Sequence, residues 1–209
     1  MKMTIETDNK RGNSLAPAIR KLTLAPLLAA FMLVYLYGVQ PEIFCAVSVG
    51  KSIHVLIRQL LFLSLFPLLA YPMQPLIPAF RDKGRDGQRH LAMLFAFAGY
   101  LLNCILNTCT DTPMELRLIG WVYLLSGIMI LLLNRLCGFR ASGHAAGVGA
   151  VAGIPVVLGH QNTLIVSLPL LLCVCWASIK MKRHTLSQFI VGLVIPIGLM
   201  MLLTYLRGV

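Results

Sequence analysis

Residues 185–206 read TLSQFIVGLVIPIGLMMLLTYL, a stretch without a single charged side chain. About 20 mostly apolar residues make a helix long enough to cross the hydrocarbon core of a bilayer. The same test finds six further candidate spans, at residues 22–38, 53–71, 91–109, 116–134, 144–160 and 163–179. The sequence therefore predicts an all-α, polytopic transmembrane bundle of about seven spans. The alternative of six stays open because the span at 144–160 is short.

The overall composition supports the same fold class. The chain is 58% hydrophobic and 12% charged, whereas soluble domains are typically about 45–50% apolar and 25% charged. The formal net charge of +11 would fit nucleic-acid binding in a soluble protein. In a membrane protein, the excess of Lys and Arg in cytoplasmic loops explains it. We therefore predict an integral membrane protein without a nucleic-acid partner.

The arrangement of charges predicts domains and orientation. Residues 1–21 are polar and end in the basic pair Arg20-Lys21, so we expect a flexible tail followed by one transmembrane domain over 22–209. If the N-terminus is cytoplasmic, the inner segments carry 14 Lys and Arg residues and the outer segments three. The positive-inside rule then favours that orientation. The apolar run at 22–38 lacks a small-residue cleavage site and is interpreted as an uncleaved anchor.

Few polar side chains fall within the predicted spans. Asn103 and Asn107 lie one turn apart and are expected to form hydrogen bonds between helices. His54, Arg58 and Gln59 begin the second span, either as a polar cluster or as side chains that reach to the interface. The six cysteines include no Cys-x-x-Cys pair, so neither a metal site nor a disulfide framework is predicted.

Two histidines mark the candidate functional site. No Asp or Glu occurs in residues 116–209, which contain His144 and His184 at the starts of two apolar stretches. Because the chain crosses the membrane twice between them, both histidines are expected on the same side. The chain near them carries four cations, which are Arg140, Lys180, Lys182 and Arg183. Helix N-termini attract anions, and Ser142 is placed to cap the helix that begins at Gly143. This pattern favours an anionic ligand such as phosphate.

The two segments resemble motifs of the type 2 phosphatidic acid phosphatase superfamily of membrane enzymes. The family pattern Pro-Ser-Gly-His is similar to Ala141-Ser-Gly-His144, and a two-helix hairpin leads to the pattern Ser-Arg-x5-His-x3-Asp. Here His184 takes the histidine position, Gln188 the Asp position and Ser178 the Arg position. The first family motif, Lys-x6-Arg-Pro, does not occur. The resemblance covers roughly residues 135–206.

The resemblance implies a phosphatase-like core that acts on lipid phosphates or diphosphates without a cofactor. His184 would be the nucleophile that forms a phosphohistidine, and His144 would protonate the leaving group. Gln188 would orient His184. The implied phosphate-binding residues are Arg140, Ser142, Gly143, Lys180, Lys182 and Arg183. The resemblance further implies anionic or phosphorylated membrane lipids as partners, and a location in the bacterial inner membrane.

Other functions remain open on the sequence. A protein of the same fold could bind anionic headgroups or act as an envelope scaffold without turnover, which the absent carboxylate and arginine favour. The two histidines could also be plain interfacial residues. A transporter is disfavoured because few polar groups lie deep in the spans. The small residues Ala145, Gly149 and Gly153 predict close helix packing beside His144, with or without a site.

Overall fold

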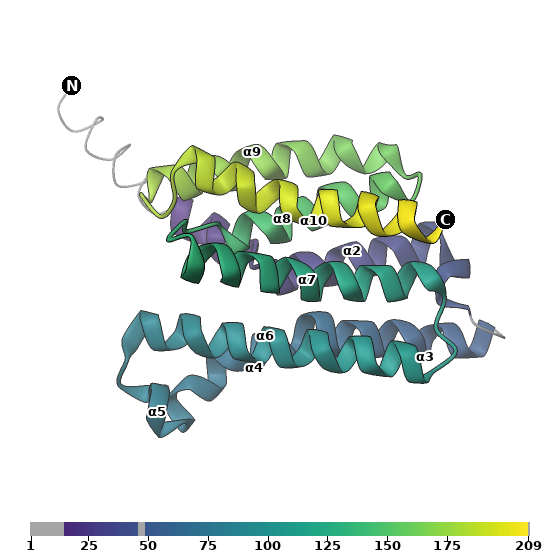
Figure 1. Ribbon diagram of the computed structural model, residues 1–209, viewed down its shortest axis with the longest axis horizontal. Helices are drawn as coiled ribbons and strands as arrows, with labels where there is room; N and C mark the ends of the chain where they lie inside the picture. The colour runs from purple at the N-terminus through teal and green to yellow at the C-terminus, as the bar shows by residue number, and fades with distance from the viewer. Residues whose placement is uncertain (1–14, 46–48, 209) are drawn as a thin grey trace. The chain divides into compact units, whose positions relative to one another are not determined.

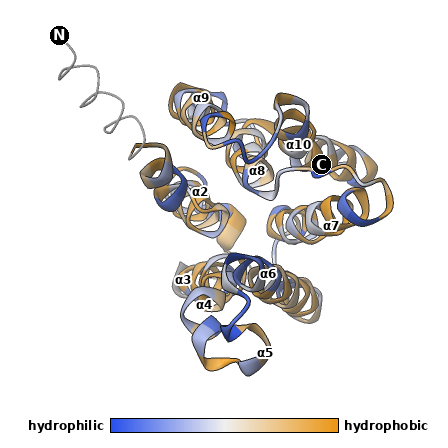
Figure 2. Ribbon diagram, turned by 90° about the vertical axis from the view of Figure 1, so that its left-hand side faces the viewer, coloured by the Kyte–Doolittle hydropathy of each residue, from blue (hydrophilic) through white to orange (hydrophobic). Residues whose placement is uncertain are grey.

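The computed structural model of the protein describes residues 15–45 and 49–208. Within these ranges all regular elements are helices, so the all-α prediction is confirmed (Figure 1). The stretches long and apolar enough to cross a bilayer are Ile53–Leu76, Gly84–Cys109, Met114–Leu136, Gln161–Lys180 and Leu186–Arg207. These long apolar helices are typical of a membrane protein. Figure 2 shows apolar residues over much of the helix surfaces and hydrophilic residues where α6 begins.

The number of spans depends on one bend near the N-terminus. The helix Leu15–Leu22 and α2 (Ala25–Val39) meet at 52°, and they give a sixth candidate if they form one broken span. Pro26 lies in the first turn of α2, where its missing N–H costs no helical hydrogen bond. The fifth predicted span corresponds to α8 (Gly143–Val157), which has only 15 residues. A count of six to seven therefore stays a prediction.

Part of the expected N-terminal tail is helical. Residues 1–14 lie outside the described residues, but residues 15–22 form a helix instead of a flexible segment. The helix forms because one of its faces is apolar: Ala16 is buried and Ile19 packs against a core of Leu28, Ala145 and neighbouring side chains. The basic pair Arg20-Lys21 therefore belongs to the folded structure.

The described chain divides into two compact units, where we expected one domain. Unit 1 comprises residues 15–28 and 129–198 of the described chain, and unit 2 comprises the remaining described residues 29–128 and 199–208. Unit 1 contains α8, α9 (Leu164–Lys180), the end of α7 (Met114–Leu136) and most of α10 (Leu186–Arg207). The helices α2, α7 and α10 contribute residues to both units.

Unit 2 is built from α3 (Val49–Leu60), a π-helical turn (Leu61–Leu65), α4 (Phe66–Met73), the short α5 (Pro78–Arg81) and α6 (Gly84–Cys109). We predicted that the second span ends at residue 71, with Pro72, Pro75 and Pro78 marking the break. The helical stretch instead continues to Leu76 and ends before Pro78, because Pro72 lies inside α4 and a 3-10 turn follows it. Helices in membrane proteins tolerate internal prolines, since neighbouring groups and local helix adjustments satisfy the freed carbonyl.

The helices of unit 1 pack through glycines, as the small-residue spacing predicted. A methyl group on Gly149 would collide with the backbone carbonyl of Leu193 in α10, and one on Gly153 would lie 2.6 Å from Ile197 Cγ1. On another face of α8, a methyl group on Gly147 would lie 2.5 Å from Ala25 Cβ. Close approach of α8 to both neighbours therefore requires the absence of side chains at these positions. The predicted tight packing of the helix that carries His144 is confirmed.

Candidate functional site

The starts of α8 and α10 are joined by their backbones. Ser142 caps α8, as predicted, by accepting a hydrogen bond from the Ala145 N–H at 3.2 Å. The Ser142 N–H donates to the carbonyl of Gln188 at 3.1 Å. Gly192 of α10 faces the Ser142 carbonyl so closely that any side chain there would collide with it. The two motif-bearing segments therefore lie side by side, which confirms the expectation that the hairpin brings them together.

His184 is held by the other segment. Its Nδ1 lies 3.1 Å from the backbone carbonyl of Arg140. A carbonyl can only accept, so Nδ1 carries the proton in this hydrogen bond. In the neutral imidazole, Nε2 then carries the lone pair. The contact that orients the His184 ring thus comes from the α8 segment.

Gln188 caps the start of α10, and its expected role in orienting His184 stays a prediction. Its side-chain oxygen accepts the Thr185 N–H at 3.2 Å, while the Thr185 hydroxyl accepts the Gln188 N–H at 3.3 Å. This reciprocal pair is a capping box that satisfies two N–H groups at the start of α10. The sequence Thr-x-x-Gln at the head of an apolar run carries the signature of such a box.

The turn before His184 is fixed by the end of α9. Lys182 adopts φ of 50°, the Lys182 N–H donates to Ile179 O at 2.9 Å, and the Arg183 N–H donates to Ser178 O at 3.1 Å. These two bonds and the left-handed residue form a Schellman motif, in which glycine is the usual residue. The motif reverses the chain between α9 and α10, and so sets the position of His184.

His144 is anchored by a residue outside the predicted site. Thr23 Oγ1 donates to the carbonyl of Ile19 at 2.7 Å and lies 3.0 Å from His144 Nε2. Because the single hydroxyl proton is used on Ile19, the threonine oxygen accepts and His144 Nε2 donates. This contact assigns the neutral His144 ring to the tautomer protonated at Nε2.

Arg20 is the second residue that sequence reasoning missed. Its Nη1 donates to Ser178 Oγ at 3.4 Å, and Ser178 is fully buried in α9. Arg20 and Thr23 come one turn apart in the segment expected to be a tail and the start of the first span. A threonine two residues after a basic pair, within an apolar run, was the only indication in the sequence. It is a weak one, because basic pairs before spans usually mark orientation.

The charged side chains described in unit 1 are all basic. The described residues of unit 1 include no Asp or Glu. His144 lies outside the five helices of spanning length, and its pKa is lowered to about 4. Partial burial is the main cause, followed by repulsion from Arg20 and from His184. The ring is therefore neutral near pH 7 and sits among positive groups that lack a carboxylate.

The remaining predicted cations line the exposed rim of this region. The side chains of Arg140, Lys180, Lys182 and Arg183 are exposed, and Lys180 Nζ lies 4.7 Å from the centre of the Trp176 ring. Gly143 is exposed at the start of α8. The structure thus brings together His144, His184 and the Ser142 cap, and leaves the four cations free to turn towards a ligand.

Unit 2 holds a separate polar network. Asn103 Nδ2 donates to Gln59 Oε1 at 2.8 Å, Gln59 Nε2 donates to Asn107 Oδ1 at 2.8 Å, and Asn107 Nδ2 donates to Asn103 Oδ1 at 2.9 Å. The predicted hydrogen bonds between helices are confirmed. Arg58 donates to Thr110 Oγ1 at 2.8 Å and to Thr112 Oγ1 at 2.6 Å. Arg58 is therefore tied to the turn after α6.

No group of three or more His, Cys, Asp or Glu side chains in residues 15–45 and 49–208 is arranged to hold a metal ion. In comparisons with protein families, curated proteins and solved structures, no significant match to the chain was found.

Proposed function

We propose that the histidine site of unit 1 binds the phosphate group of a membrane lipid and hydrolyses it through a phosphohistidine on His184. One observation carries this proposal: His144 and His184 lie among cations in a unit whose described residues include no carboxylate. Among the described residues of unit 1, no anion neutralises these groups. An external anion with several oxygens, as in a phosphate ester, supplies the missing charge.

The geometry supports distinct roles for the two rings. The Arg140 carbonyl holds the Nδ1 proton of His184, so Nε2 carries the ring lone pair that would attack phosphorus. The bond between phosphorus and the lipid oxygen then breaks. The bound phosphate offsets the positive charge around His144, so the ring takes up a proton from water at Nδ1 and gives it to that oxygen, while its Nε2 proton stays on Thr23. Water next attacks the phosphohistidine, the P–N bond breaks, and a water proton returns to His144.

Arg20 fills a role that the motif resemblance leaves empty. Ser178 occupies the position where the family pattern has arginine, and the Arg20 guanidinium lies 3.4 Å from the Ser178 hydroxyl. We propose that Arg20 binds the phosphate oxygens from the N-terminal helix. A guanidinium suits this task because it is always charged and can form two parallel hydrogen bonds to a phosphate.

The test is phosphate release by the purified protein in detergent from phosphatidic acid, phosphatidylglycerol phosphate and undecaprenyl diphosphate. His184→Ala should abolish release, and His144→Ala should slow it by about 100-fold, the usual scale for loss of a general acid. His90→Ala is the control, since His90 is exposed on α6 in unit 2. Full activity of His184→Ala would exclude the mechanism.

One observation favours a second function, headgroup binding without turnover. The position where the family pattern has Asp is occupied by Gln188, an amide whose oxygen is engaged in capping α10. Under this alternative, phosphatidic acid binds but no phosphate is released. The discriminating variant combines Gln188→Asp, Ser178→Arg and Arg20→Ala, because two guanidinium groups would crowd the buried Ser178 position. Turnover that appears only in this variant would identify a binding protein built on a phosphatase framework.

A further inference from the structure

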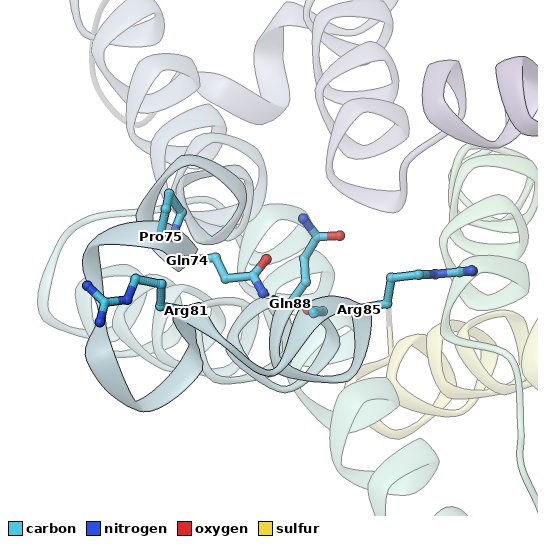
Figure 3. Close-up of a pocket in the computed structure, with 6 residues that line it drawn as sticks. Gln74, Pro75, Arg81, Arg85 and Gln88 are labelled. Carbon is cyan, nitrogen blue, oxygen red and sulfur yellow. Dashed lines mark hydrogen bonds between the residues drawn. The ribbon is translucent and has the colours of Figure 1, made fainter.

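A hollow in unit 2 lies far in sequence from the histidine site. Its volume is about 280 Å³, and it lies where the stretch Ile53–Leu76 ends and α6 begins. The hollow is lined by Gln74, Pro75, Arg81, Gly84, Arg85 and Gln88 (Figure 3). Because it sits at the ends of two helices of spanning length, it belongs at the boundary between lipid and water.

Hydrogen bonds within the turn hold the hollow in shape. Gln74 is buried, and its Nε2 donates to the carbonyl of Gly84 at 2.6 Å and to that of Phe80 at 3.3 Å. Gly84 has φ of 50°, and a methyl group on Gly87 would lie 2.7 Å from the Phe80 oxygen. Both amide hydrogens of Gln74 are thereby used. The Gln74 side chain is therefore fixed at the base of the hollow, and its Nε2 has no hydrogen left to donate to a ligand.

The side chains around Gln74 are suited to bind an anion, because two of them are arginines. Figure 3 shows Gln74 and Gln88 between Arg81 and Arg85, whose guanidinium groups are directed to opposite sides. Arg81 contacts Asp82 at 3.6 Å, but both side chains are more than half exposed, and such pairs contribute little. Residues 81–89 include four cations and two acids, and so remain net positive.

An exposed leucine close in the chain to the hollow indicates which kind of anion binds there. Leu76 is 70% exposed at the end of the spanning stretch, next in the chain to Pro75, which lines the hollow. A large exposed apolar residue at the end of a span, followed by a cationic turn, matches the order of a bilayer, with acyl chains next to phosphates. A soluble anion would make no use of Leu76, so the arrangement favours a lipid over a free ion.

We propose that this hollow binds the headgroup of an anionic phospholipid, with the guanidinium groups of Arg81 and Arg85 turning inward from their directions in Figure 3 to contact its phosphate oxygens, and with Gln88 donating from between them. Arginine suits phosphate because its donors are planar and permanently charged. This site is independent of the histidine site, since all of its residues belong to unit 2. It would hold a lipid whether or not unit 1 is an enzyme.

The experiment compares two double variants of the full chain in nanodiscs of phosphatidylcholine with added phosphatidylglycerol. Arg81→Gln/Arg85→Gln removes the two lining cations, and Lys83→Gln/Arg89→Gln removes the same charge from the same turn outside the hollow. The lining variant should bind phosphatidylglycerol about ten-fold more weakly, the loss expected for two exposed charged contacts. The control variant should bind close to wild type, because Arg81, Arg85 and Gln88 are unchanged in it.

Three results would overturn the proposal. One is equal weakening in both double variants, which would reveal a general charge effect. Another is a rise in the unfolding temperature of the wild type that is as large with inorganic phosphate as with phosphatidylglycerol, which would indicate a site for a free ion. The third concerns Gln88→Glu, which places a negative charge in the hollow and should selectively weaken binding of phosphatidylglycerol. Unchanged binding in that variant would show that the headgroup lies elsewhere.

Discussion

Thr23 Oγ1 lies 3.0 Å from His144 Nε2, although the two residues are 121 positions apart in the chain. The contact joins the N-terminal helix to the first turn of α8. It sets the tautomer of His144, because the threonine proton is already donated to Ile19. The N-terminal segment is therefore part of the histidine site, and its residues should influence both stability and chemistry.

Replacing Thr23 with Val should destabilise the protein by about 1–3 kcal/mol, the cost of leaving a buried donor without a partner. The cause is the His144 N–H, which loses its acceptor while the side-chain shape is kept. Thermal and denaturant unfolding in detergent measure the change. Thr204→Val is the matched control, since the Thr204 hydroxyl also bonds a carbonyl four residues earlier, that of Met200. Equal losses in both variants would show that His144 is not involved.

Stability should depend on pH through His144. The folded protein holds the pKa of His144 at about 4, below the ordinary value of 6.5. Between these two values the unfolded chain binds a proton that the folded chain does not, so stability falls as the pH drops from about 6.5 towards 4. Unfolding midpoints across this range measure the effect. His144→Phe should flatten that part of the profile, and an unchanged slope would contradict the assignment.

Phosphate binding at the histidine site should be accompanied by proton uptake. Arg20 and His184 both lower the pKa of His144, and a bound phosphate would offset their charge and raise it again. Calorimetric titration with a short-chain phosphatidic acid at pH 6, in two buffers of different ionisation enthalpy, measures the protons taken up. Wild type should give different heats in the two buffers. Heats for His144→Phe that still differ to the same extent would assign the uptake to another group.

Much of this site could be predicted because it follows from chain direction and local caps. Two crossings return the chain to one side, which brings His144 towards His184, and a serine before an apolar run caps a helix. The small residues Gly149 and Gly153 predicted the close packing that holds α8 against α10. These features depend on neighbours in sequence or on simple topology, so they can be derived without coordinates.

Other features could not be predicted, because several hydrogen-bond partners are possible for one side chain and the sequence does not show which of them it contacts. The Gln188 side chain could form a hydrogen bond with an imidazole or with the start of its own helix, and its oxygen accepts the Thr185 N–H. The contacts of Arg20 with Ser178 and of Thr23 with His144 join segments more than 120 residues apart. A short helix such as Leu15–Leu22 has too few turns for its apolar face to stand out from a polar tail.

The last prediction separates close packing from other effects of glycine. Gly192→Ala should lower the unfolding midpoint and phosphate release together, because the methyl group would meet the Ser142 carbonyl and push α10 away from the α8 cap. Overpacking of this kind typically costs about 1–3 kcal/mol. Gly198→Ala lies on the same helix with nothing within 4 Å of the added methyl, so it should be neutral or slightly stabilising. If both variants behave alike, the distance between the two helix starts does not control the site, and the joint placement of His144 and His184 would need another cause.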